Sequence, residues 1–159
     1  MHQPPSAARR MRIRPLFNRQ AMFSSASGDW ETPQGLFDEL NKEFGFTLDA
    51  CATAETAKCA EFYTLADNGL GCPWSGTVFV NPPYGSGITA WIAKGYSEAR
   101  VCGHTVVMLL PARTDTAWFH EYVLRADEIR FIRGRLKFSG WHTSAPFPSM
   151  VVVFRGKKP

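Results

Sequence analysis

The sequence predicts an α/β domain built on a largely parallel β-sheet. Two observations carry this prediction. From residue 29 onward, short apolar segments alternate with segments that have helical periodicity, which is typical of a sheet covered by helices. In addition, residues 105–110 (Thr-Val-Val-Met-Leu-Leu) are apolar almost throughout, as expected of a central strand buried on both faces. The 159 residues suffice for one such domain with a real core, but not for two.

The elements can be placed in order along the chain. Thr32 can cap a helix whose first residue is Pro33 and which Gly45 ends, because Leu36, Phe37, Leu40 and Phe44 follow at helical spacing. Residues 81–83 (Asn-Pro-Pro) end a clear strand, since proline cannot continue a sheet ladder. We expect strands over 46–49, 61–65, 76–80, 105–110, 128–132 and 150–154, and further helices over 89–100 and 117–124.

Composition and charge exclude several classes of protein. Apolar residues make up 45% and charged residues 20%, as in folded soluble domains. No apolar run reaches the roughly 18 residues that a membrane-spanning helix needs, and no secretory signal is visible, so we expect a cytoplasmic protein without membrane contact. Without a Cys-x-x-Cys pair or paired histidines, we expect reduced thiols and no metal site; the cysteines are Cys51, Cys59, Cys72 and Cys102.

The positive charge is concentrated at the amino terminus. The net charge is +4, yet residues 1–27 contain five arginines and no acidic residue, so the remainder is almost neutral. We therefore expect a basic, disordered leader over 1–27 and a folded domain over 28–156. The leader can bind phosphates non-specifically, or it can be a solubilising tail. Within the domain, the local basic cluster consists of Arg130, Arg133, Arg135 and Lys137.

The segment with the clearest chemistry is residues 81–84 (Asn-Pro-Pro-Tyr), directly after an apolar strand. The two prolines make a stiff turn that displays the Asn81 side-chain oxygen, the Pro82 carbonyl and the Tyr84 ring. Two acceptors and an aromatic face suit an NH2 group on a flat ring. Hydrogen bonds to both N–H groups favour a pyramidal nitrogen, whose lone pair can then attack a methyl group. The segment therefore predicts methyl transfer to a planar amine.

This segment matches the [Asp/Asn/Ser]-Pro-Pro-[Tyr/Phe/Trp] signature of amino-group methyltransferases that use S-adenosylmethionine. More closely, residues 30–154, about four fifths of the chain, resemble the phage-type DNA N6-adenine methyltransferases. The matching pieces include Asp29-Trp-Glu-Thr-Pro33, Phe46-Thr-Leu-Asp-Ala-Cys-Ala52, Asn81-Pro-Pro-Tyr-Gly85, Leu110-Pro-Ala-Arg-Thr-Asp115, Ile132-Arg-Gly-Arg-Leu136 and Ala145-Pro-Phe-Pro-Ser149.

The resemblance implies a Rossmann-like methyltransferase fold, with a mostly parallel sheet and an antiparallel C-terminal strand. It also implies methyl transfer from S-adenosylmethionine to the N6 amine of a flipped-out adenine in double-stranded DNA. Such proteins are encoded by phages or prophages, so the expected location is the cytoplasm of the bacterial host. The implied catalytic residues are Asn81, Pro82, Pro83 and Tyr84.

Cofactor contacts carried over from the wider class are the Thr-Pro pair before the first strand and the acidic residue that ends this strand. Here they correspond to Thr32, Pro33 and Asp49. Asp49 also fits the rule that parallel sheets bind ligands at carboxyl ends. Asp67 is either a further cofactor acceptor or an ordinary turn aspartate. The Gly-x-Gly loop of many such enzymes is absent, and small residues 50–54 (Ala-Cys-Ala-Thr-Ala) replace it.

The DNA contacts predicted from the sequence are basic residues near strand ends. Arg113 follows the central strand and can bind a phosphate, shape the target pocket or brace its own loop through an ion pair. Arg133, Arg135 and Lys137 can line the DNA backbone or form a solvated edge. No target-recognition domain is evident, so loops 85–88, 111–116 and 133–148 would read the bases and a short recognition sequence is expected.

The signature selects a geometry and does not select adenine. Methylation of a guanine amine in RNA or of a protein glutamine therefore stays an alternative. So does a non-catalytic DNA-binding module that keeps the fold, which the missing glycine loop and the basic leader favour.

Overall fold

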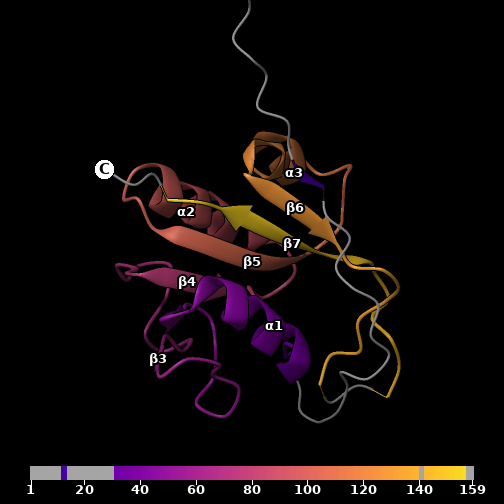
Figure 1. Cartoon of the computed structure of the whole chain (residues 1–159), viewed down its shortest axis with the longest axis horizontal. Coiled ribbons are helices and arrows are strands. Elements are labelled where there is room, and N and C mark those ends of the chain that lie inside the picture. Colours follow the sequence, from indigo (N-terminus) through magenta and orange to yellow (C-terminus); the bar gives the residue numbers. More distant parts are fainter. Residues whose placement is uncertain (1–11, 14–30, 140–141, 157–159) are drawn as a thin grey trace, which may run out of the picture.

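The computed structural model describes residues 12–13, 31–139 and 142–156. Within them lies a seven-stranded sheet with the order β1-β6-β7-β5-β4-β2-β3 (Figure 1). The strands are β1 (Arg12–Ile13), β2 (Leu48–Asp49), β3 (Glu61–Phe62), β4 (Thr77–Val80), β5 (Thr105–Pro111), β6 (Glu128–Phe131) and β7 (Ser149–Phe154).

The sheet is parallel apart from its C-terminal strand. β7 pairs antiparallel with both β5 and β6, whereas the pairs β2–β3, β2–β4, β4–β5 and β1–β6 are parallel. The Rossmann-like prediction with an antiparallel C-terminal strand is therefore confirmed. The apolar character of residues 106–110 is explained as well, because these residues are fully buried in β5, between β4 and β7.

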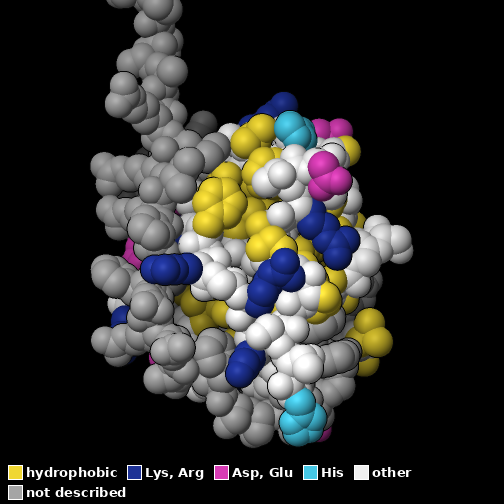
Figure 2. Space-filling view, turned by 90° about the vertical axis from the view of Figure 1, so that its right-hand side faces the viewer, with side chains coloured by type: hydrophobic (Ala, Val, Ile, Leu, Met, Phe, Trp, Pro, Cys, Tyr) yellow, Lys and Arg dark blue, Asp and Glu magenta, His cyan; other side chains and the backbone are white. Residues whose placement is uncertain are grey.

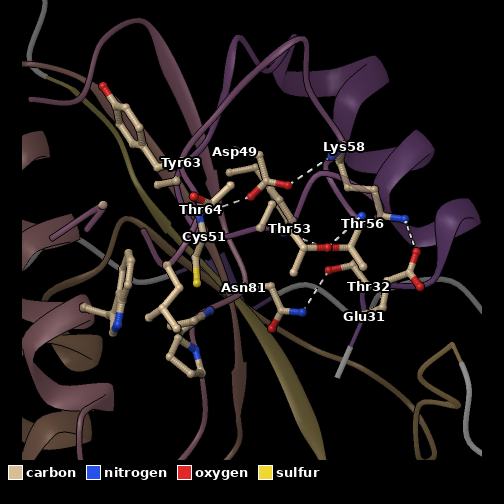
Figure 3. A pocket seen from close by; sticks show the side chains of 18 of the residues that line it. Glu31, Thr32, Asp49, Cys51, Thr53, Thr56, Lys58, Tyr63, Thr64 and Asn81 are labelled. Atoms are coloured by element: carbon tan, nitrogen blue, oxygen red, sulfur yellow. Dashed lines mark hydrogen bonds and ion pairs between the residues drawn. The ribbon is translucent and has the colours of Figure 1, made fainter. Parts of the chain in front are cut away.

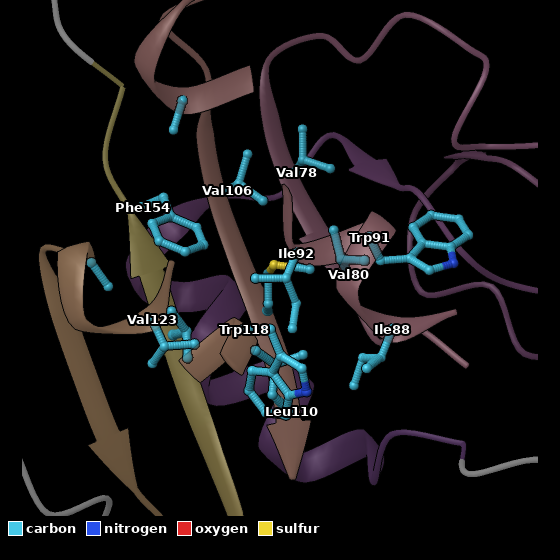
Figure 4. Packing of buried hydrophobic residues seen from close by; sticks show 14 of the residues in the cluster. Val78, Val80, Ile88, Trp91, Ile92, Val106, Leu110, Trp118, Val123 and Phe154 are labelled. Atoms are coloured by element: carbon cyan, nitrogen blue, oxygen red, sulfur yellow. The ribbon is translucent and has the colours of Figure 1, made fainter. Parts of the chain in front are cut away.

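Helices cover both faces of the sheet. α1 (Gln34–Phe44) packs its apolar side on one face. α2 (Ile88–Arg100) and the short α3 (Ala117–Glu121) cover the other face, and Figure 1 shows α2 behind β5. On that second face, Trp91 and Ile92 of α2 lie against Val78, Val80 and Val106 of the sheet (Figure 4). Neighbouring strand residues are buried on opposite faces of the sheet, and the core therefore has two layers.

The helix α1 begins one residue later than predicted. Its N-cap residue is Pro33 and no side chain caps it, so the prediction that Thr32 caps this helix is wrong. The Thr32 hydroxyl instead accepts a hydrogen bond from Asn81, 49 residues away. Gly45 ends the helix as predicted, in the left-handed conformation with φ of 63°.

Two strands and one helix are shorter than predicted. β2 and β3 each span two residues, and the turn that ends β3 is closed by Asp67, which accepts from the Thr64 backbone N–H at 2.7 Å. α3 ends at Glu121, and a 3₁₀ turn over Val123–Arg125 follows it. Local periodicity cannot show these ends because hydrogen bonds to residues beyond the segment decide them.

The order of the strands places a crevice between β2 and β4. The chain leaves β2 toward the outer strand β3 and then returns past β2 to form β4, so the connections diverge at this point. In open α/β sheets, ligands bind at the carboxyl ends of the strands where this divergence occurs. The two residues at these ends are Asp49 and Asn81, which the sequence had singled out.

Part of the predicted leader is described. Arg12 and Ile13 form β1, which pairs with β6, and the rest of residues 1–27 lies outside the described residues. None of the helices that the structure describes combines the length and the apolar character needed to span a bilayer.

Candidate active site

A cavity of about 530 Å³ opens at the carboxyl ends of β2 and β4 (Figure 3). Its size lies within the range of about 300–1,000 Å³ that is usual for small-molecule sites. Most of the predicted catalytic and cofactor residues share its wall. Apart from Thr32, they lie at the ends of β2 and β4, which are neighbours in the sheet although β3 lies between them in the sequence. The predicted residues in the wall are Thr32, Asp49, Asn81, Pro82, Pro83 and Tyr84.

Asp49 is an almost buried carboxylate at the end of β2, with 2% of its surface exposed. Its oxygens accept from the backbone N–H of Lys58 at 3.1 Å and of Cys51 at 3.4 Å. Burial raises the pKa of Asp49 to about 6, and the two backbone donors oppose that rise only in part. A cationic ligand group beside Asp49 would favour the ionised form, so the site is suited to bind an ammonium group.

The wall opposite β4 contains a residue that sequence reasoning missed. Lys58 Nζ forms an ion pair with Glu31 Oε1 at 2.9 Å and donates to Gln34 Oε1 at 3.1 Å. These contacts join the loop after β2 to the start of α1. Because the partners lie 24 and 27 residues away, no local pattern could identify them.

Small residues let the loop after β2 form the floor of the cavity. Ala50 is fully buried there, and both Ala50 and Ala52 line the cavity. Gly69 packs directly on the Ala50 carbonyl, where a Cβ atom would collide. The Gly69 carbonyl in turn accepts from Trp74 Nε1 at 2.8 Å. The backbone therefore lies directly at the cavity surface because Ala50 and Gly69, which are 19 residues apart in the sequence, both have little or no side chain.

The Asn-Pro-Pro-Tyr turn after β4 (residues 81–84, here called the diproline corner) lines the same cavity. Asn81 follows the last residue of the strand, and its Nδ2 donates to Thr32 Oγ1 at 3.1 Å (Figure 3). Tyr84 contacts two aromatic rings edge-on, Phe147 at 5.2 Å and Phe138 at 6.3 Å between centroids. The Tyr84 hydroxyl donates to the Leu109 carbonyl at 3.4 Å, and burial raises its pKa. The ring is therefore fixed beside the cavity and stays neutral.

Two predicted cofactor residues do not line the cavity. Pro33 is buried at the start of α1. Asp67 is exposed, and its carboxylate accepts from both the N–H and the hydroxyl of Thr64 at 2.7 Å. These bonds hold the pKa of Asp67 below its usual value. Asp67 therefore closes a turn, and its role as a cofactor acceptor stays a prediction.

The predicted DNA contacts lie outside the cavity. Arg113, Arg133, Arg135 and Lys137 are exposed, on loops that follow β5 and β6. The Arg113 guanidinium lies 5.9 Å from the Phe147 ring, which also contacts Tyr84. Figure 2 shows the side of the molecule toward which β6 points, where Lys and Arg side chains surround exposed hydrophobic ones.

Arg130 differs from the other members of the predicted basic cluster. Its guanidinium is buried and pairs with Glu43 at 2.6 Å and Glu128 at 2.7 Å. Arg130 therefore belongs to an internal ion-pair network that joins α1 to β6. Although Arg130 and Arg133 belong to one basic cluster in the sequence, Arg130 lies buried in β6 and Arg133 lies in the exposed loop after it.

The described residues contain no group of three His, Cys, Asp or Glu side chains able to hold a metal ion. All four cysteines lie in the described part of the chain, and none forms a disulfide.

Comparisons with known proteins identify the family of this chain. The family model for DNA N-6-adenine-methyltransferase (Dam) matches residues 21–158. The DNA N-6-adenine-methyltransferase of Haemophilus phage HP1 is 32% identical over 139 residues, which cover 82% of this chain and 80% of that protein. The DNA N-6-adenine-methyltransferase of Escherichia phage T1 is 34% identical over 110 residues, 67% of this chain and 45% of that protein.

A shorter match involves the putative methyltransferase YfdM of Escherichia coli K12, which is 41% identical over 78 residues, 43% of this chain and 86% of that protein. The family model covers most of the chain, including every residue of the cavity wall. This chain belongs to the DNA N-6-adenine-methyltransferase (Dam) family.

Proposed function

We propose that this protein transfers a methyl group from S-adenosylmethionine to the N6 amine of adenine in double-stranded DNA. The observation that carries the proposal is that the acidic end of β2 and the diproline corner after β4 line one cavity. A methyl donor and a methyl acceptor must meet within van der Waals distance, and this arrangement allows both to occupy the same crevice. Membership of the family supports the same reaction.

The residues of the cavity fit the cofactor. Asp49 provides a buried carboxylate for its ammonium group, and Ala50, Ala52 and Gly69 leave room for it near the backbone. Leu65, which is 97% exposed, also lines the cavity and would offer an apolar surface to the cofactor. When bound, S-adenosylmethionine supplies an electrophilic methyl group on a sulfonium centre. Thr32, which lines the cavity, is proposed as a further cofactor contact, whereas Pro33 lies outside the cavity wall and would act only by starting α1 beside it.

The target amine is activated at the corner. Asn81 Oδ1 and the Pro82 carbonyl would accept the two N6 hydrogens, which would concentrate the lone pair on nitrogen for attack on the methyl group of the donor, with the sulfur as leaving group. Acceptors fixed where positive charge develops, in a site that excludes water, lower the barrier far more than the same bonds would in water. The methylated nitrogen then loses one proton to solvent, so no dedicated base is required.

Adenine must leave the duplex to reach this corner. The Tyr84 ring provides a stacking surface, and base–aromatic stacking contributes about 1–3 kcal/mol. Arg113, Arg133, Arg135 and Lys137 are placed on exposed loops where they would bind the phosphates beside the flipped nucleotide. With loops 85–88, 111–116 and 133–148 as the base-reading elements, we expect a short recognition sequence.

The direct test is methyl transfer to three substrates under one set of conditions: unmethylated duplex DNA, RNA, and a glutamine-containing peptide. Radiolabelled S-adenosylmethionine and nucleoside analysis identify the product. We expect label in N6-methyladenine from the DNA alone. Label in guanine or glutamine would redirect the assignment to another planar amine. Absence of saturable cofactor binding in calorimetry would indicate the non-catalytic module.

A further inference from the structure

We propose that Lys58 binds the carboxylate of the cofactor's amino-acid end, next to the place where Asp49 binds its ammonium group. The inference rests on the proposed function and deepens it, because it names the cationic half of a site for a zwitterion. The amino-acid end of S-adenosylmethionine carries an ammonium and a carboxylate on one carbon atom. A site for this end is therefore best formed by an acidic and a basic group close together.

The charges on the cavity wall fit such a ligand. Among the described residues that line the cavity, the charged ones are Glu31, Asp49 and Lys58, so Lys58 is the only basic residue of this set. Two acidic residues and one basic residue leave the wall with one surplus negative charge when all are ionised. S-adenosylmethionine, with a sulfonium, an ammonium and a carboxylate, has one surplus positive charge. The wall and the ligand thus have complementary charges.

Lys58 lies directly beside Asp49. Its backbone N–H donates to Asp49 Oδ2 at 3.1 Å (Figure 3). Burial raises the pKa of Asp49, and the positive charge of Lys58 is one of the influences that oppose this rise, so the two charged groups lie within electrostatic reach of each other. The two contacts needed by an amino-acid zwitterion can therefore be supplied by neighbouring groups.

The ammonium group of Lys58 can donate one more hydrogen bond. It has three N–H donors, and its acceptors among the described residues are Glu31 Oε1 at 2.9 Å and Gln34 Oε1 at 3.1 Å. The side chain is only 7% exposed, so water has little access to the third donor. A buried donor without an acceptor is unfavourable, and a ligand carboxylate would provide a strong, charge-assisted partner.

Glu31 explains how Lys58 stays charged before the ligand binds. A buried lysine without a counter-charge would tend to lose its proton, and the ion pair with Glu31 prevents this. The pair lies on the same side of the cavity as Thr32, the further cofactor contact proposed above (Figure 3). A ligand carboxylate would join Glu31 as an acceptor, and the ligand's own ammonium group at Asp49 would balance the added negative charge.

The experiment compares two ligands by calorimetry on the full chain. One is S-adenosylmethionine, and the other is its decarboxylated form, which keeps the sulfonium and the ammonium but lacks the carboxylate. The variants are K58M, E31Q/K58M and, as a matched control, K94M. Lys94 also forms a largely buried ion pair, with Glu98 at 3.0 Å, but it lies on α2 and outside the cavity wall.

The double variant removes both members of the ion pair and leaves the net charge of the wall unchanged. We expect E31Q/K58M to bind S-adenosylmethionine about tenfold or more weakly than the wild type, as for loss of a hydrogen bond between charged groups. The decarboxylated ligand should bind within about twofold of the wild type, because the contact at Asp49 is retained. K94M should bind both ligands within about twofold of the wild type.

The single variant K58M separates a direct contact from a general charge effect. It makes the wall more negative, so charge alone would tighten the binding of the positively charged S-adenosylmethionine. Loss of a contact with the carboxylate would weaken this binding, which is the result we expect. Because the two explanations differ in sign, K58M decides the question even if E31Q/K58M fails to fold.

Two results would overturn the inference. One is an equal loss of affinity for both ligands in E31Q/K58M, which would show that Lys58 only maintains the shape of the cavity. The other is unchanged or tighter binding of S-adenosylmethionine by K58M. A protein that shows the expected affinities but does not methylate adenine would refute the proposed function and leave this inference intact, whereas a wild type that binds neither ligand would refute both.

Discussion

At the scale of single residues, the site depends on a buried carboxylate, Asp49, whose ionised form lowers the stability of the fold. Its carboxylate ends β2 with 2% of its surface exposed, and burial raises its pKa from 3.8 to about 6. The native protein therefore binds this proton more tightly than the unfolded chain does. As a result, the free energy of unfolding decreases as the pH rises from about 4 to about 6, by up to about 3 kcal/mol. The ionised residue is useful only when a cation is bound beside it.

The first prediction follows from this cost. Asp49→Asn removes the charge and keeps an acceptor for the backbone donors, so we expect the variant to unfold at higher urea concentration than the wild type at pH 7.5, without cofactor. At pH 4.5, where the wild-type carboxyl is largely protonated, the difference should be smaller by about 1–2 kcal/mol. Calorimetry should show weaker binding of S-adenosylmethionine to the variant at pH 7.5. A stability difference that is the same at both pH values would contradict the assigned pKa.

The second prediction separates chemistry from binding at the corner. Asn81→Ala removes an acceptor that acts in the transition state, so we expect kcat to fall by about a hundredfold or more. The affinity for S-adenosylmethionine should stay within about threefold of the wild type, because the amide faces Thr32 and the target base. Methyl incorporation and calorimetry measure the two quantities. Equal losses of both would show that Asn81 supports the cavity and does not act on the amine.

At the scale of elements, the crevice depends on how closely α2 approaches β5. Gly95 makes this approach possible, since a Cβ atom there would lie 2.9 Å from Met108 Sδ and 3.3 Å from Val106 Cγ1. The same helix carries Trp91, which lies both in the core and on the cavity wall. A shift of α2 would therefore change the shape of the cavity.

The third prediction tests this contact. Gly95→Val introduces a branched side chain into a close-packed interface, and we expect it to lower the free energy of unfolding by about 3 kcal/mol. The control is Ala90→Val on the exposed side of the same helix, where the cost should be less than about 1 kcal/mol. Urea unfolding monitored by circular dichroism measures both. Equal losses in the two variants would show that packing on β5 does not determine the effect, because helix propensity alone would favour Gly95→Val and disfavour Ala90→Val.

At the scale of the whole molecule, the charge is arranged by face. The exposed basic loops after β5 and β6 lie at the carboxyl ends of the strands, which is also where the cavity opens. Other basic residues, such as Arg130 and Lys58, are consumed in ion pairs with acidic partners. The small net charge of the domain therefore conceals a face suited to binding a polyanion.

The fourth prediction concerns the salt dependence of DNA binding. Arg113→Gln and Arg133→Gln should each weaken binding and reduce the slope of log Kd against log salt by about 1, as expected for the loss of a phosphate contact. Lys42→Gln removes the same charge from the last turn of α1, at the other end of the sheet, and should leave the slope unchanged. Fluorescence anisotropy on a short duplex measures all three. A similar change with Lys42→Gln would indicate a general charge effect without a defined face.

Much of this molecule can be derived from its sequence, because the deciding patterns are local. The apolar run at 105–110, the helix ended by Gly45 and the prolines after β4 each determine backbone structure within a few residues. Six residues of the cavity wall could also be named, since strand ends, the Thr-Pro pair and the Asn-Pro-Pro-Tyr signature mark them in the chain.

The tertiary structure alone decided how these residues act together. The partner of the Thr32 hydroxyl is 49 residues away, Lys58 bonds to residues of α1, and Arg130 is buried between Glu43 and Glu128. Sequence spacing contains no information on such pairs, because they form only when strand order and helix packing bring distant segments together. For the same physical reason, Thr32 looked like a helix cap in the sequence and is a partner of Asn81 in the fold.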